Sequence, residues 1–178
     1  MTTITRVGIV RAASVSDLHG MAVVNEQAFQ GNRGDMGAAR RWVHCWFRAY
    51  PIYQYFVMAS AGKVVGYIGW QVHGGFCRSD PVVELEQVAF LEEYQGKGLG
   101  PRLITESLDM VREWMRSEGN QTAQDLNIIV WAYDSNDNAL RAYEKTLFAD
   151  GTRGMRLQYV NRGAELMLRG QMSLNQAP

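Results

Sequence analysis

The chain has 178 residues, of which 47% are apolar and 20% are charged. These values are typical of one globular domain, so we expect a single domain over residues 1–178 with a frayed tail at 171–178. Eighteen Lys and Arg residues balance eighteen Asp and Glu residues. Because there is no basic excess, nucleic acid and anionic membrane surfaces are disfavoured as partners.

Cysteine content and hydropathy indicate the compartment. The two cysteines are too few for a disulfide framework, and the chain has neither a signal-peptide pattern nor an uncharged apolar run of about 18 residues. We therefore expect a cytoplasmic protein.

His73 and Cys77 have a plausible metal-ligand spacing, but a four-ligand zinc site would need nearly all of the three His and two Cys residues, so we expect no metal.

The first 50 residues predict a strand and two helices. A short apolar strand at 7–10 precedes a helix that starts at a capping box, formed by Ser14 and Asp17. Apolar and aromatic side chains then recur at helical spacing over 39–50, and Pro51 ends that second helix.

The middle of the chain predicts three strands. Segments 55–60 and 64–72 flank a turn in which Gly62 permits the left-handed backbone of a tight hairpin. A further strand at 82–90 follows a loop. By the period-two rule of strands, one of its faces carries Glu84, Glu86, Val88 and Phe90.

The last third of the chain alternates helices and strands. A helix begins with Pro101 at its first position and ends near Gly119. A strand at 126–131, a helix at 136–147 and a closing hairpin of strands 155–160 and 164–168 complete the chain. The predicted class is mixed α/β, of the α+β kind, with mostly antiparallel strands.

Three alternate glycines, Gly96, Gly98 and Gly100, join the strand at 82–90 to the following helix. Their backbone N–H groups can converge on a phosphate beside the positive end of the helix dipole. A plain Gly-rich turn with Lys97 in solvent is the alternative reading. The spacing fits neither the dinucleotide fingerprint nor the nucleoside-triphosphate loop.

The pattern Q-x-x-G-x-G at Gln95, Gly98 and Gly100 resembles the acetyl-CoA pyrophosphate motif of the GNAT superfamily of N-acetyltransferases. Segment 136–145 is similar to the second motif of that family. The resemblance implies a central, mostly antiparallel mixed sheet of about six or seven strands with about four helices. It also implies a V-shaped cofactor notch between the strands at 82–90 and 126–131.

The resemblance implies residues that bind acetyl-CoA. The Val88 N–H would hold the thioester oxygen, the main chain of Phe90 would pair with the pantetheine, and Asn136 would cap its helix and bind the pantetheine too. The remaining candidates form the pyrophosphate loop: Gln95, Gly96, Lys97, Gly98 and Gly100. Pro101 departs from the family pattern because it has no N–H to donate.

Two residues are candidates for catalysis. Glu84 stands eleven residues before Gln95, where some family members carry a catalytic carboxylate, and it would deprotonate the acceptor amine. Glu86 and Glu26 remain alternative bases. Tyr143 matches the family's general acid, which returns a proton to the CoA thiolate, or it is a core aromatic residue.

We predict an N-acetyltransferase that transfers the acetyl group of acetyl-CoA to a primary amine by direct attack. A non-catalytic acyl-CoA-binding or sensing module of the same fold is the alternative. The acceptor stays open, although Glu84 and Glu86 favour a cationic one, and a homodimer is possible. About three of seven aromatic residues should reach an acceptor pocket. The seven are Trp42, Trp46, Phe47, Tyr50, Tyr53, Tyr55 and Phe56.

Overall fold

The structure is a computed structural model, and it describes residues 8–73, 81–119, 125–133, 135–147, 154–160 and 163–173. The strands of this part are Ile9–Ala12 (β1), Tyr53–Ser60 (β2), Lys63–His73 (β3), Val82–Phe90 (β4), Asp125–Tyr133 (β5), Gly154–Val160 (β6) and Gly163–Ser173 (β7). The α-helices of this part are Leu18–Ala28 (α1), Met36–Phe47 (α2), Leu99–Ser117 (α3) and Asp137–Leu147 (α4).

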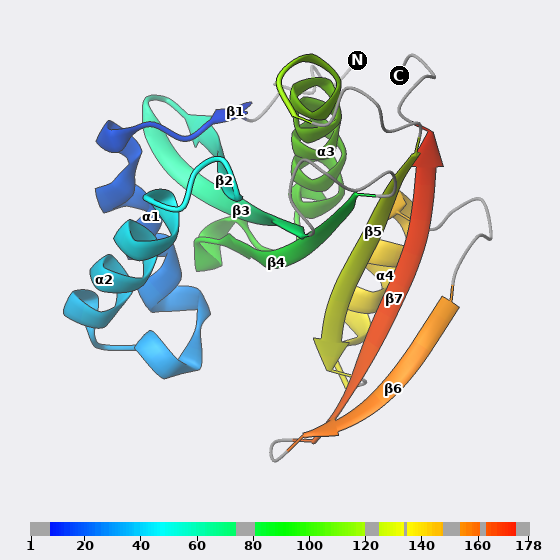
Figure 1. The fold of residues 1–178 in the computed structure, drawn as a ribbon. Coiled ribbons are helices and arrows are strands. Elements are labelled where there is room, and N and C mark those ends of the chain that lie inside the picture. Colours follow the sequence, from blue (N-terminus) through cyan, green and yellow to red (C-terminus); the bar gives the residue numbers. More distant parts are fainter. Residues whose placement is uncertain are drawn as a thin grey trace, which may run out of the picture.

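The strands form one sheet in the order β1-β2-β3-β4-β5-β7-β6 (Figure 1). Every neighbouring pair is antiparallel except β4 and β5, which are parallel. Their pairing ends at Leu85 and Val130, although the two strands continue to Phe90 and Tyr133. The strands therefore diverge, as Figure 1 shows, and the predicted mixed sheet with a notch between its central strands is confirmed.

Helices cover both faces of the sheet. The apolar stripe of α3, which includes Leu103, Ile104 and Val111, packs with Tyr143 of α4 against one face. Helices α1 and α2 cover the other face of the first strands, where Met21 and Val43 pack against Tyr67. Both clusters are buried, so β2, β3 and β4 have a core on each side. Among the described residues, no helix is long and apolar enough to cross a membrane.

Several predicted boundaries shift. Helix α3 begins at Leu99, with Gly98 as a left-handed N-cap, and not at Pro101. Pro101 is tolerated because the first N–H groups of a helix have no intrahelical partner. Helix α2 ends at Phe47, before the predicted residue 50. Part of the tail predicted to be frayed belongs to β7, which pairs up to Ser173, and residues 174–178 lie outside the described part.

Strand β4 contains a β-bulge that the period-two rule did not predict. Gly69 of β3 pairs with Gln87, while the next residue, Trp70, pairs with Leu85, so Glu86 has no partner opposite it. An extra residue in one strand reverses the alternation of side chains beyond it. The prediction that Glu84 and Glu86 share a face with Val88 and Phe90 is therefore wrong. Val88 and Phe90 instead pack in the cluster that contains Val83 and Leu85.

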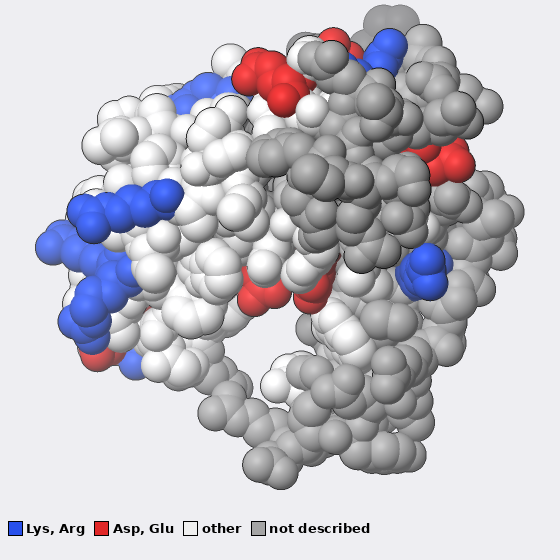
Figure 2. Space-filling model, viewed as in Figure 1, with Lys and Arg blue, Asp and Glu red and all other residues white. Residues whose placement is uncertain are grey.

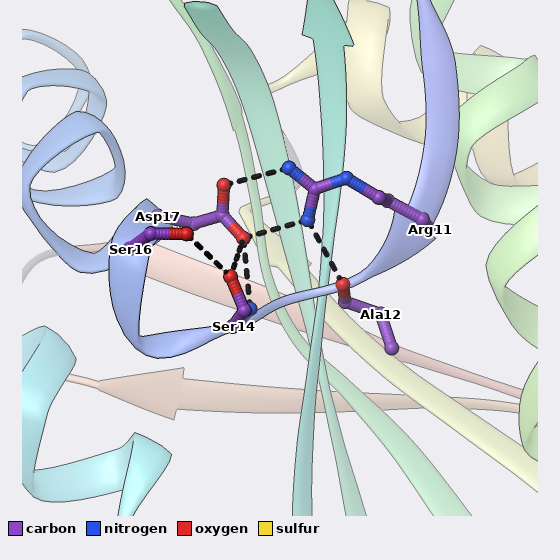
Figure 3. Close-up of polar contacts among 5 residues, drawn as sticks. All are labelled: Arg11, Ala12, Ser14, Ser16 and Asp17. Carbon is purple, nitrogen blue, oxygen red and sulfur yellow. Dashed lines mark hydrogen bonds and ion pairs between the residues drawn. The ribbon is translucent and has the colours of Figure 1, made fainter. Parts of the chain in front are cut away.

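An ion pair joins β1 to the start of α1 (Figure 3). The Arg11 guanidinium donates to both carboxylate oxygens of Asp17, at 2.6 and 2.8 Å. The Ser14 N–H and hydroxyl also donate to Asp17, which completes the predicted capping box. The hydrogen bond from Arg11 is the largest cause that lowers the pKa of the buried Asp17 carboxyl to about 2.

Candidate functional site

A groove of about 1050 Å³ lies where β4 and β5 diverge. Its walls come from the end of β4, the glycine loop, the start of α3, helix α4, the end of β5 and the end of α1 with the residues that follow it. The groove thus collects most of the predicted cofactor-binding residues, together with the predicted acid. These lining residues are Val88, Phe90, Gln95, Gly96, Gly98, Gly100, Asn136 and Tyr143.

The glycine loop has the backbone of an anion cradle. Gly96 and Gly98 have φ values of +68° and +72°, a region that L-residues with side chains rarely adopt. A Cβ added at Gly96, Gly98 or Gly100 would meet no atom of the chain within 4 Å. The space beside these glycines is therefore open to a ligand at the N-terminus of α3, a fit for the pyrophosphate of a CoA molecule.

Gln95 and Lys97 have other contacts in this structure. The Gln95 side chain donates to the Phe90 carbonyl at 3.1 Å and so ties the loop back to the end of β4. The Lys97 ammonium lies 5.2 Å from the centroid of the Tyr94 ring, a cation–π distance, and Lys97 is not among the residues that line the groove. Their predicted binding of acetyl-CoA stays a prediction.

Phe90 is accommodated by a glycine on the neighbouring strand. Gly66 of β3 is its direct partner across the ladder, and a Cβ at Gly66 would lie 2.3 Å from the Phe90 ring. The aromatic side chain therefore fills the space that a side chain at Gly66 would need. This pairing lets the large residue stand at the wall of the groove.

Helix α4 presents the second motif to the groove. The Asn136 side chain accepts from the Ala139 N–H at 3.2 Å, so the predicted N-cap is confirmed. Tyr143 is 6% exposed and lines the groove. Burial raises its pKa to about 12, so its hydroxyl keeps its proton at neutral pH and can donate a hydrogen bond.

The two acidic residues of β4 have different surroundings. Glu84 accepts a 2.6 Å hydrogen bond from the His73 ring, which sequence analysis did not assign to the site. Glu86, at the bulge, is exposed to solvent and forms no ion pair with another described residue. Desolvation by the surrounding protein and the charge of Glu84 raise its pKa, while His73 lowers it. Figure 2 shows acidic atoms over the middle of β4, at the edge of an opening.

A buried polar network on the α1 side of the sheet was also missed. The Asn25 side chain donates to the Tyr67 hydroxyl at 2.6 Å, and this hydroxyl donates to the Gln87 side chain at 3.0 Å. The network therefore fixes α1 against the strand residue next to the bulge. A glutamine at a core position of a strand was the only signal of it in the sequence.

Two further tyrosines lie beside this network. The hydroxyls of Tyr53 and Tyr55 are buried and have no hydrogen-bond partner beyond each other. Burial, together with charges that include Glu86, raises the pKa of both groups.

None of the seven aromatic residues predicted to approach an acceptor pocket lines the large groove. Trp42 and Tyr50 are exposed, and Tyr53, Tyr55 and Phe56 are core residues.

The remaining candidate residues are Glu26, His73 and Cys77. Glu26 accepts from the Gly34 N–H at 2.6 Å and lines a second pocket with Arg33, and it is not among the residues that line the groove. Cys77 lies outside the described residues, and His73 pairs with Glu84. In the described ranges, no group of three or more His, Cys, Asp or Glu side chains could hold a metal ion.

A splayed pair of central strands, with a glycine loop that leads into a helix N-terminus, is the arrangement that the resemblance to the acetyl-CoA-dependent N-acetyltransferases predicts. The sequence model of the acetyltransferase (GNAT) family matches residues 23–147, most of the chain. The chain belongs to this family, whose cosubstrate is acetyl-CoA. A search of curated proteins found no match.

Solved structures share the fold at low sequence identity. The ribosomal-protein-S18-alanine N-acetyltransferase of Escherichia coli is 18% identical, with a TM-score of 0.62 and 96% of each chain covered. A putative acetyltransferase of Salmonella typhimurium, solved with acetyl-CoA, is 20% identical, with a TM-score of 0.63 and 96% of each chain covered. The spermidine/spermine N-acetyltransferase of Vibrio cholerae is 17% identical, with a TM-score of 0.60, covering 93% of this chain and 94% of its own. The named acceptors differ, so the fold leaves the acceptor open.

Proposed function

We propose that this protein transfers the acetyl group of acetyl-CoA to a primary amine by direct attack of the amine on the thioester. The observation that carries the proposal is the groove between β4 and β5. It brings Val88, the glycine loop and Tyr143 to one cavity. Acetyl-CoA supplies an activated acyl group there, and the residues around it bind the donor and move protons.

The main chain holds the donor. The N–H groups of Gly96, Gly98 and Gly100 bind the pyrophosphate, aided by the positive end of the α3 dipole. The Val88 N–H donates to the thioester oxygen and stabilises the negative charge that grows on it during attack. The Phe90 carbonyl already accepts from Gln95, so it offers the pantetheine its second lone pair. Asn136 completes the pantetheine contacts.

Proton transfer accompanies the exchange of bonds. The amine nitrogen forms a bond to the carbonyl carbon and the carbon–sulfur bond breaks, while the amine proton passes to Glu84, directly or through water. His73 orients the Glu84 carboxylate. The departing sulfur receives a hydrogen bond from Tyr143 and becomes a thiol. Because the pKa of Tyr143, about 12, lies above that of a thiol, about 8.5, full transfer from the phenol is uphill. Its contribution should therefore be smaller than that of Glu84.

Calorimetric titration and turnover test these roles. Wild-type protein, Glu84→Gln and Tyr143→Phe should bind acetyl-CoA with similar affinity. In a thiol-release assay against an amine panel, Glu84→Gln should lower kcat about 100-fold and Tyr143→Phe about tenfold. Binding without turnover of any amine would instead favour the acyl-CoA-binding module. Absence of binding would contradict the proposed cofactor site.

The acceptor amine, a homodimer and the cytoplasmic location stay predictions. The E. coli relative is named for a ribosomal protein and the V. cholerae relative for polyamines, so the amine panel includes both peptide N-termini and small amines.

A further inference from the structure

The bulge of β4 holds polar groups that the proposed acetyl transfer does not use. Glu86 is the bulged residue, and it lies on the same face of the sheet as α1 and α2. The hydroxyls of Tyr53 and Tyr55 lie on the same face. These three side chains are called the bulge cluster below.

The bulge cluster carries an unbalanced negative charge. Of the two carboxylates on β4, Glu84 has the His73 ring as its partner at 2.6 Å. Glu86 has no cation within ion-pair distance among the described residues, and its charge is felt by both tyrosines. An exposed carboxylate that lacks a cation partner attracts positively charged ligands.

The tyrosine hydroxyls are the second, independent sign of a ligand. Tyr53 is 1% exposed and Tyr55 5%, yet neither hydroxyl has a hydrogen-bond partner beyond the other tyrosine of the pair. Leaving a buried polar group unpaired costs about 1–3 kcal/mol, so such groups usually serve a bound molecule or water. The Tyr53 hydroxyl lies against Gly69, whose partner on β4 is Gln87, the neighbour of Glu86. The hydroxyl therefore points at the bulge.

Aromatic rings surround the same place. The ring centroids of Trp46 and Tyr53 are 4.6 Å apart, and those of Tyr53 and Tyr55 are 4.9 Å apart. A carboxylate, hydroxyl oxygens and ring faces together match the chemistry of an alkylammonium group, which donates hydrogen bonds and is attracted to aromatic rings.

We propose that the bulge cluster binds a second, non-reacting ammonium group of the acceptor, so that the preferred acceptors are alkyl diamines and larger polyamines. This inference rests on the proposed function. The reacting amine must lose its charge before it attacks the thioester. A full positive charge beside Glu86 throughout the reaction must therefore come from a second cationic group of the acceptor, and an alkylammonium group fits the hydroxyls and rings of the bulge cluster.

Three acceptors of equal chain length test the proposal. Diaminobutane, butylamine and aminobutanoate present the same reacting amine and differ only in a cationic, neutral or anionic far end. In the thiol-release assay, kcat/KM of the wild-type protein should be at least about tenfold higher for diaminobutane than for butylamine, and lowest for aminobutanoate.

The variants locate the preference. In Glu86→Gln the ratio of kcat/KM between diaminobutane and butylamine should fall toward one, and Glu86→Asp should retain part of it. Glu113→Gln removes the same charge from an exposed position on α3, and it should keep the wild-type ratio. Binding of acetyl-CoA to each variant verifies that it has folded.

Two results would overturn the proposal: equal kcat/KM for diaminobutane and butylamine, or a preference that survives Glu86→Gln. Failure of the proposed function is separate from this. If no amine is turned over, calorimetric titration of the CoA-bound protein with diaminobutane and butylamine decides. Tighter binding of diaminobutane that is lost in Glu86→Gln supports the bulge cluster as a cation site. Equal binding of the two amines contradicts it.

Discussion

The two faces of the central sheet carry different kinds of chemistry. On the side of α3 and α4, the groove offers the donor mainly backbone groups: the glycine loop, the N-terminus of α3 and the diverging end of β4. On the side of α1 and α2, the polar features are side chains, among them Glu86 at the bulge, the hydroxyls of Tyr53 and Tyr55, and the network from Asn25 to Gln87.

This difference separates the binding of acetyl-CoA, which the members of the family share, from the recognition of the acceptor, which differs between enzymes. Backbone N–H groups are present in every sequence, so a groove that uses them needs only glycines and a strand break at the correct places. Recognition of an acceptor needs particular side chains at particular positions. We therefore expect substitutions on the α3 face to affect acetyl-CoA, and substitutions on the α1 face to affect the acceptor or stability.

The largest expected effect is at Gly98. Valine at this position would have to adopt a φ of +72°, and its side chain would enter the open space of the cradle. Loss of about two charge-assisted hydrogen bonds to phosphate should lower acetyl-CoA affinity about 100-fold in calorimetric titration.

Gly34 offers a matched control for this substitution. Its φ is +75°, a Cβ there also meets nothing within 4 Å, and it does not line the groove. Gly34→Val should therefore cause similar backbone strain with unchanged acetyl-CoA affinity. Equal loss of affinity in both variants would mean that strain, and not the cradle, explains the result at Gly98.

The next effect tests the contact between Gly66 and Phe90 at the wall of the groove. Because a Cβ at Gly66 would lie 2.3 Å from the Phe90 ring, Gly66→Ala should lower the free energy of unfolding by about 1–3 kcal/mol. Denaturant titration measures it. Phe90→Leu should restore much of the loss in the double variant, and strictly additive effects would show that the two positions are not coupled.

The sequence allowed much of the groove to be predicted. The strand, glycine loop and helix are contiguous in the chain, so the motif of Gln95, Gly98 and Gly100 specifies them together. The order of the elements and the hairpin at Gly62 followed from local turn and capping rules. The splay between β4 and β5 came from family resemblance alone.

The side chains of the α1 face could not be predicted in the same way. One extra residue in β4 reverses the alternation beyond Glu86, and nothing local in the sequence marks a bulge without glycine. The contact of His73 with Glu84 depends on the register of β3 and β4, and that of Asn25 with Tyr67 joins residues far apart in the chain. Such long-range pairs follow only from the folded sheet.

A smaller effect on stability concerns the ion pair between Arg11 and Asp17, which joins β1 to the start of α1. Asp17 has an ordinary pKa of 3.8 and a folded-state pKa of about 2. It therefore stabilises the fold above about pH 4, and this contribution disappears as the pH falls toward 2. Since Arg11 is 44% exposed and partly screened, we expect about 1–2 kcal/mol. Asp17→Asn and Arg11→Met should lose it at neutral pH and approach wild-type stability near pH 2, as followed by denaturant titration.

The smallest effect distinguishes a binding hydroxyl from a structural one. Because the Tyr53 hydroxyl is buried with no partner other than the Tyr55 hydroxyl, Tyr53→Phe should leave the free energy of unfolding unchanged or raise it by up to about 1 kcal/mol. Tyr67→Phe is the matched control, since its hydroxyl joins Asn25 to Gln87 and its loss should cost about 1–3 kcal/mol. A clear loss of stability in Tyr53→Phe would mean that the fold itself uses this hydroxyl. If stability is kept while the preference for diaminobutane declines, the α1 face retains an unpaired hydroxyl because its partner is the acceptor.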